Sequence, residues 1–178
     1  NTLGVTGSAK FLNLQNVMPG TGQVAFVGTS PAMFYPHPVS NPNILQNNAA
    51  GTVVSTNHVV APGRQVRIEN GTFDVSSNAR DIYCSGLTVS GGTLNAAGYA
   101  ISESGDWSFD NILDLGDVTL TGTGRTIYSA GNTFGNLTVA GNYAMSDDLI
   151  ASEDLVVAGT LDAAGQSISE GGDRKSVV

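Results

Sequence analysis

Short apolar runs recur along the whole chain, with apolar residues at alternate positions and glycines between the runs. Two stretches, 86–106 and 154–173, share the frame L-x-V-x-G, T-L-(N/D)-A-A-G and I-S-E-x-G-D. Alternation is the period of a strand with one buried face, and runs of about four to six residues have the length of strands. Glycine and β-branched residues disfavour a helix, and glycine permits sharp turns. Each frame therefore predicts three strands and three corners, which make one coil of a solenoid.

One such coil cannot bury its own inward face, so it must stack on a neighbour that has the same pattern. The sequence predicts an all-β, parallel β-solenoid with three strands per coil. It is expected to be right-handed, because nearly all parallel crossovers are. We interpret four isoleucines as one stacked column: Ile82, Ile101, Ile127 and Ile168. Their spacing predicts coils of about 18 to 26 residues and roughly seven or eight coils in all.

The solenoid is predicted to occupy residues 1–172 as a single domain, in which a longer similarity predicts two large repeats, 22–112 and 116–172. Segment 30–42, SPAMFYPHPVSNP, departs from the pattern because it contains four prolines. Proline has no backbone N–H to donate to a sheet. We therefore predict that this segment is an insertion loop outside the solenoid body.

The charge balance and the lengths of the apolar runs argue against nucleic acid and membranes as partners. The chain of 178 residues has a formal net charge of −8 and only 7 lysines and arginines. An acidic surface repels nucleic acid and anionic membranes, and no apolar run is long enough to span a bilayer. We predict no nucleic-acid partner and no direct insertion into a membrane.

Both ends of the sequence lie inside the repeat pattern. The chain begins at Asn1 without a methionine, and we interpret it as a mature or truncated piece. Neighbouring coils of the full-length chain would then be its first partners, and its uncapped ends are expected to associate. The last six residues, 173–178, read DRKSVV and break the pattern. They match the translation of a common sequencing adapter, and we interpret them as a non-native tail of a metagenomic fragment.

Three motifs follow one another over residues 22–172: G-x-V-x-F-x-G-T, then N-(I/L)-x-(I/V/Q)-x-N, then L-x-V-x-G-T-L-(D/N)-x-x-G-x-x-I. This order is similar to that of repetitive bacterial surface and secreted proteins, which resemble adhesins and autotransporter passengers. The resemblance implies a right-handed parallel β-helix at the cell surface or outside the cell, with glycans or cell-surface proteins as partners. It implies no single activity, because such repeats have many unrelated functions.

Asp147 and Asp148 form an adjacent acidic pair. The paired carboxylates of a glycan-cleaving site must face one cleft, whereas neighbours on a strand point to opposite faces. The pair would therefore have to lie in a turn, which the sequence SDDL favours. No histidine-glycine or basic motif accompanies it, so we predict no catalytic residue and no cofactor.

Four acidic residues fall near glycine corners: Asp106, Asp117, Glu153 and Asp154. Stacked carboxylates can bind calcium, but the G-G-x-G-x-D repeat is absent, and we interpret these residues as solvated turns. His37 and His58 are far apart and have no cysteine nearby, which gives zinc no support. The single cysteine, Cys84, allows no internal disulfide and is predicted to be a small buried strand residue. We predict no metal site.

Aromatic residues are the remaining candidates for contact with a ligand or partner, since exposed rings can bind glycans. These candidates are Phe34, Tyr35, His37 and Trp107. Trp107 and Phe109 alternate as in a half-buried strand, so core packing is expected for at least one of them. The run Thr119, Thr121 and Thr123 is typical of flat ice-binding faces, but uneven coil lengths argue against regular threonine ranks.

Three functions fit these observations. The first is a non-enzymatic rod segment with a structural or adhesive role in a bacterial extracellular or cell-surface protein. The second is a glycan-active β-helix, namely a polysaccharide lyase, a hydrolase or a phage tailspike. The third is a stalk unit that stacks end to end. We favour the first, because the charges are few and scattered whereas the inward apolar ladder repeats.

Overall fold

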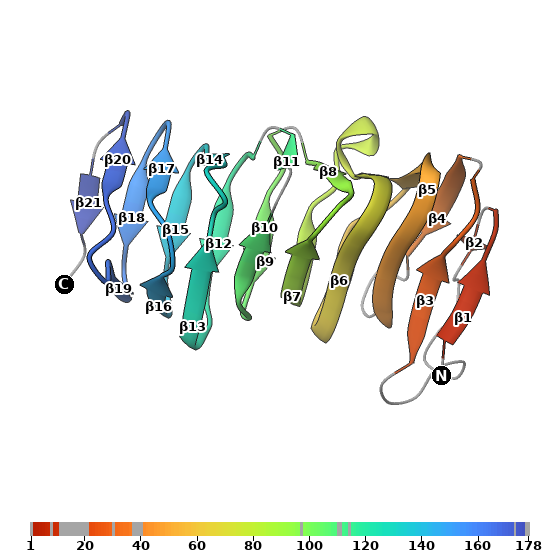
Figure 1. Cartoon of the computed structure of the whole chain (residues 1–178), viewed down its shortest axis with the longest axis horizontal. Helices are drawn as coiled ribbons and strands as arrows, with labels where there is room; N and C mark the ends of the chain where they lie inside the picture. The colour runs from red at the N-terminus through yellow and green to blue at the C-terminus, as the bar shows by residue number, and fades with distance from the viewer. Residues whose placement is uncertain are drawn as a thin grey trace.

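In this computed structural model the chain is a parallel β-solenoid of about seven coils. The structure describes residues 2–7, 9–10, 22–29, 31–36, 41–96, 98–109, 112–113, 115–172 and 174–176. The coils stack along one axis, from β1 at the N-terminal end to β21 at the C-terminal end (Figure 1). Every described strand pair is parallel, and the described residues contain no α-helix. The predicted all-β solenoid is therefore confirmed.

Face 1 is the sheet with which each coil begins. Its strands pair from one coil to the next along the rod. Paired residues are separated in the sequence by about the length of one coil, as Ile44 is from Val66 and Ile127 from Met145. The face consists of β1 (Thr2–Val5), β3 (Gln23–Phe26), residues 43–46 of β5 (Asn43–Ser55), residues 65–68 of β6 (Val59–Asp74), residues 86–89 of β7 (Ile82–Val89), β10 (Trp107–Phe109), β13 (Thr123–Tyr128), β16 (Asn142–Met145) and β19 (Thr160–Asp162).

Face 2 follows face 1 in each coil and lies along the upper edge of the rod in Figure 1. One series of strands comprises β2 (Ala9–Lys10), β4 (Ala32–Tyr35), residues 52–55 of β5, residues 72–74 of β6, β8 (Thr93–Asn95) and β11 (Ile112–Leu113). A separate three-stranded sheet follows: β14 (Thr133–Phe134), β17 (Leu149–Ala151) and β20 (Ile168–Glu170).

Face 3 completes each coil and returns the chain to face 1. It comprises residues 59–61 of β6, residues 82–84 of β7, β9 (Ile101–Glu103), β12 (Val118–Leu120), β15 (Leu137–Val139), β18 (Leu155–Val157) and β21 (Arg174–Ser176). The long strands β5, β6 and β7 run around corners, and so each contributes to two faces. A coil thus contributes one strand to each of the three faces, which agrees with the predicted three strands per coil.

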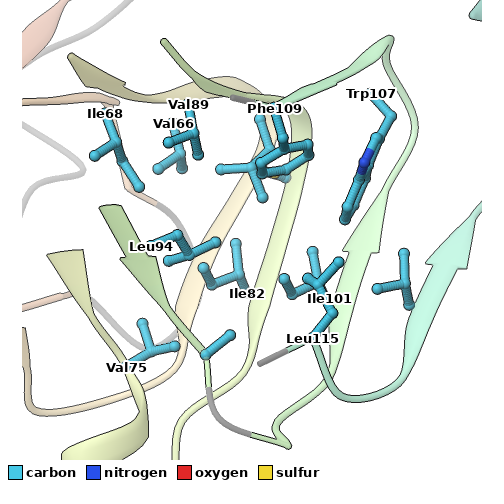
Figure 2. Packing of buried hydrophobic residues seen from close by; sticks show 14 of the residues in the cluster. Val66, Ile68, Val75, Ile82, Val89, Leu94, Ile101, Trp107, Phe109 and Leu115 are labelled. Carbon is cyan, nitrogen blue, oxygen red and sulfur yellow. The ribbon is translucent and has the colours of Figure 1, made fainter. Parts of the chain in front are cut away.

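The interior is a continuous apolar column, because every second residue of each strand points inward. On face 1 the successive inward residues are each at most 1% exposed: Val24, Ile44, Val66, Leu87, Trp107 and Ile127. Figure 2 shows the three faces meeting, with Val66 and Val89 from face 1, Leu94 from face 2 and Ile101 from face 3. Each coil thus buries its inward face against both neighbours.

Glycines form a column at the corner between face 3 and face 1. The column contains Gly105, Gly122, Gly141 and Gly159, each stacked on the corner of the preceding coil. A Cβ atom on Gly141 would lie 1.9 Å from the carbonyl oxygen of Gly122, and one on Gly159 would lie 2.0 Å from that of Gly141. These corners need glycine because the backbones of adjacent coils touch there.

The predicted insertion loop at 30–42 is wrong for its described residues. Residues 32–35 form β4, which pairs with β5 through Ala32 and Val53 and with β2 through Phe34. Phe34 is fully buried, and its ring packs edge-on against Phe26 with centroids 5.5 Å apart. Pro31 and Pro36 flank the strand and so remove no donor from its interior. His37 and Pro38 lie outside the described residues.

The predicted isoleucine column is correct only for its first pair. Ile82 and Ile101 are partners on face 3. Ile127 lies on face 1 opposite Met145, and Ile168 lies on face 2 opposite Leu149. The error arose because similar branched apolar residues occupy inward positions on all three faces. A short 3₁₀ turn, Ser76–Asn78, also lengthens the coil before Ile82.

Candidate binding face

The predicted aromatic contact residues divide between core and surface. Phe34 is fully buried and Trp107 is 1% exposed. The ring of Trp107 lies 4.1 Å from that of Phe109 and 5.2 Å from that of Phe134, measured between centroids. Phe34 and Trp107 therefore offer no surface to a partner, which corrects the expectation for both. Tyr35 is 37% exposed, and its role as a contact residue stays a prediction.

Asp147 and Asp148 lie in the turn between β16 and β17, but their carboxylates bond in opposite directions along the rod. Asp147 accepts hydrogen bonds from the backbone N–H and the hydroxyl of Ser129, at 2.8 and 2.9 Å, on the preceding coil. Asp148 accepts one from the backbone N–H of Ser167, at 2.8 Å, on the following coil. Each carboxylate joins its turn to a different neighbouring coil, and the two do not face one cleft.

The acidic residues near glycine corners are distributed over two corners. Asp106, between faces 3 and 1, accepts a hydrogen bond from the Thr126 backbone N–H at 2.9 Å. Asp117 and Asp154 lie instead where the chain enters face 3, and Glu153 is an exposed residue beside Asp154. Among the residues that the structure describes, no three His, Cys, Asp or Glu side chains converge as metal ligands.

Two ranks of outward side chains cross face 3. The first, which we call the Asx rank, is Asp117, Asn136 and Asp154, each immediately before a strand of face 3. The side-chain amide of Asn136 donates to Asp117 at 2.8 Å, and its carbonyl oxygen accepts the Asp154 backbone N–H at 3.0 Å. The amide thus connects three successive coils and holds the Asp117 carboxylate in position.

The second rank, which we call the hydroxyl rank, is Ser102, Thr119 and Thr138, which are partners across β9, β12 and β15. All three are half-buried and alternate with buried residues, so they point outward. Val156 continues the rank on β18, and the 42%-exposed Tyr83 precedes it on β7. A polar rank therefore extends over successive coils of this face, although only Thr119 and Thr138 in it are threonines.

A groove of about 370 Å³ lies between the two ranks. Its lining residues are Asp117, Val118, Thr119, Asn136, Thr138, Asp154 and Val156. The lining contains carboxylates, an amide and hydroxyls, and no lysine or arginine. Such a surface can exchange hydrogen bonds with a hydroxylated ligand.

A second groove, of about 380 Å³, lies on face 1. Its lining includes Gly124, Arg125, Asn142, Ala144 and Asp162. The groove crosses β13 and β16, whose pairing shifts register between Thr123 and Arg125. Its polar groups are therefore less regularly spaced than those of face 3.

A buried polar cluster that the sequence interpretation did not identify lies beneath the corner between faces 3 and 1. Glu103 is fully buried, between Cys84 on one coil and Leu120 on the next. Its Oε1 accepts the Leu87 backbone N–H at 2.9 Å, whereas its Oε2 has no hydrogen-bond partner in the described structure. The frame I-S-E could have indicated this buried residue, because its glutamate lies two positions after the inward isoleucine and so on the same side of the strand.

Burial sets the protonation of this cluster. Burial raises the pKa of the Glu103 carboxyl to about 8, against a smaller opposing effect of the Leu87 N–H, and Asp106 adds to the rise. Burial also raises the pKa of the Cys84 thiol, with a further contribution from Glu103. The Tyr143 hydroxyl accepts the Gly122 N–H and donates to the Gly105 carbonyl, both at 3.0 Å, and burial raises its pKa. The cluster closes the corner with neutral groups at neutral pH.

No family model, no curated protein and no solved structure matches this chain. In the part of the chain that the structure describes, no helix has the length and apolar character needed to cross a membrane.

Proposed function

We propose that the chain is a rod segment whose role is structural or adhesive and not catalytic. The observation that supports this most is the bonding between coils. Parallel ladders on three faces and one apolar interior continue through the described coils. Such repetition yields length and stiffness, because each coil of about 20 residues extends the rod by about 4.8 Å.

Side chains at the corners strengthen the same architecture. Asp106, Asn136, Asp147 and Asp148 each accept a backbone N–H from the next or the preceding coil. These bonds use four corner side chains to hold neighbouring coils together. This use of carboxylates favours a mechanical role over an active site, in which titratable groups converge in one pocket.

We place this role outside the cell or at its surface, in a bacterial protein of the adhesin type. The sequence pattern resembles that of such proteins, and the long narrow architecture suits a spacer that holds a binding module away from a membrane. Neighbouring coils of the longer chain, glycans and cell-surface proteins are the partners that this role requires.

The mechanical role is tested by stretching the chain between two handles in an optical trap. We expect stepwise unzipping in which each coil, about 20 residues, releases about 70 Å of chain. Asp147→Ala should lower the force of one step, because it removes the two bonds from Ser129 to the Asp147 carboxylate. Glu153→Ala, at an exposed position in a later turn, is the matched control. Extension without steps, at forces that stretch an unfolded chain, would refute the proposal.

A glycan-cleaving activity is the second candidate, and the face 3 groove is the observation in its favour. Asp117 and Asp154 both line it, two coils apart, so their backbones are separated by about 9.6 Å. Cleavage products should then appear by chromatography when the chain is incubated with polysaccharides. Loss of those products in Asp117→Asn or Asp154→Asn would establish the enzyme and displace the structural role.

A further inference from the structure

Face 3 is the regular surface of the rod. From β9 through β12 and β15 to β18 its strands pair without a register shift. Face 1 has a shift between β13 and β16. Constant register places equivalent side chains about 4.8 Å apart along the axis, as adjacent strands are. A ligand that lies along the rod therefore meets side chains at the same spacing on each coil.

The groups on face 3 suit a hydroxylated and uncharged ligand. Thr119 and Thr138 make no side-chain hydrogen bond within the described structure, so their hydroxyls are available to a partner. The carboxylates and the amide of the Asx rank can accept further hydrogen bonds from ligand hydroxyls. Bonds to neighbouring coils already position the Asp117 carboxylate and the Asn136 amide, which lowers the entropy cost of binding.

The charges in the groove disfavour anionic polymers. The charged side chains in the groove are the carboxylates Asp117 and Asp154, and Asp81 lies at the equivalent corner before β7. Like charges brought together at an interface oppose association. A polyuronate or a nucleic acid would place its anionic groups against these carboxylates, whereas a neutral polymer would not.

Tyr83 supplies an apolar surface at one end of the same rank. It is 42% exposed and pairs with Ser102, the first member of the hydroxyl rank. Its hydroxyl donates to Asp81 at 3.3 Å, which orients the ring. An exposed aromatic ring beside polar groups can stack on the apolar face of a sugar.

We propose that face 3 binds a neutral polysaccharide that lies along the rod axis, with sugar hydroxyls in the groove between the Asx and hydroxyl ranks and one sugar ring on Tyr83. This inference rests on the proposed adhesive role and gives that role a ligand class. The bound polymer spans the coils from Tyr83 to Val156 and contacts both ranks on the coils of Thr119 and Thr138.

Affinity electrophoresis tests this directly. The chain is run in native gels that contain hydroxyethyl cellulose, mixed-linkage β-glucan or galactomannan as neutral probes, and polygalacturonate as the anionic probe. We expect retardation in at least one neutral gel and none in polygalacturonate. Tyr83→Ala, and Thr119→Val together with Thr138→Val, should each raise the dissociation constant about tenfold.

Thr88→Val is the matched control, because Thr88 is an outward, half-buried residue of face 1. It should leave retardation unchanged. Absence of retardation in all three neutral gels, equal retardation of the face 3 variants and the wild type, or preference for polygalacturonate would each overturn the proposal. The optical-trap measurement separates this failure from failure of the rod: stepwise unzipping without glycan binding would leave the structural role intact.

Discussion

Glu103 is the residue whose chemistry differs most from its surroundings. Its carboxyl is fully buried, and one of its oxygens has no hydrogen-bond partner in the described structure. An ionised carboxylate in such a place is costly, so the folded chain retains the proton. The pKa of Glu103, about 8 in the folded state, lies above its unfolded value near 4.5. Between these values the folded chain binds one more proton than the unfolded chain.

The pH dependence of stability follows from that difference. The free energy of unfolding should fall as pH rises from 5 to 8, by up to about 1.4 kcal/mol per pH unit, because the unfolded state releases its proton first. Glu103→Gln should remove this slope, since the amide is neutral throughout. Urea unfolding at pH 5, 6, 7 and 8 measures both, with Glu153→Gln as an exposed control that keeps the slope. Identical slopes in wild type and Glu103→Gln would contradict the assignment.

At the scale of the element, β4 illustrates how neighbouring coils decide local structure. The predicted repeat frame places no glycine corner beside its four residues, and prolines flank them on both sides. Pairing with β5 and β2 makes the segment a strand, and the rings of Phe26, Phe34 and Phe73 pack together beneath it. The aromatic side chains therefore stabilise a coil that the repeat pattern alone does not specify.

Phe34→Ala should destabilise the chain by about 3 to 5 kcal/mol, because it leaves a cavity in a close-packed core. Tyr35→Ala, on the same strand but facing outward, should cost less than about 1 kcal/mol. Chemical denaturation monitored by circular dichroism gives both values. Equal costs for the two variants would mean that Phe34 does not pack as the structure has it.

Alternation and glycine spacing were enough to predict strands, coils and their parallel stacking, because both patterns follow directly from backbone geometry. They could not assign a strand to its face, since Ile101, Ile127 and Ile168 occupy equivalent inward positions on three different faces. The candidate site was less predictable still. The groove depends on which outward residues stack across coils, and Thr119 and Thr138 become neighbours only once that register is known.

At the scale of the whole molecule, each coil is stabilised by the coils on either side of it. In the middle of the rod Leu94 and Ile101 are essentially unexposed, whereas Leu161 and Ile168 near the C-terminal end are half-buried. In stacked repeats the stability of a unit is about its own contribution plus those of its interfaces. The central coils should therefore open less often than the outer ones.

Native-state hydrogen exchange should accordingly show the slowest exchange for backbone amides of β7, β9, β10 and β12, and faster exchange toward β1 and β20. Mass spectrometry of proteolytic fragments after timed labelling resolves these regions. Uniform protection along the rod would indicate a single cooperative unit and would contradict a model of coils that open one by one.

The corner contacts also have a consequence for the gene that encodes the chain. Bonds such as those of Asn136, Asp147 and Asp148 each join a side chain to a backbone N–H 18 or 19 residues away, one coil along the rod. Every residue except proline has a backbone N–H, so an in-frame duplicate of one coil offers its own N–H groups to the side chains of the coil beside it. The same holds for the glycine column, where a copied Gly141 stacks on a glycine corner as the original does. Tandem duplication and loss of about 19 codons can therefore change the length of this protein without a change in its contacts.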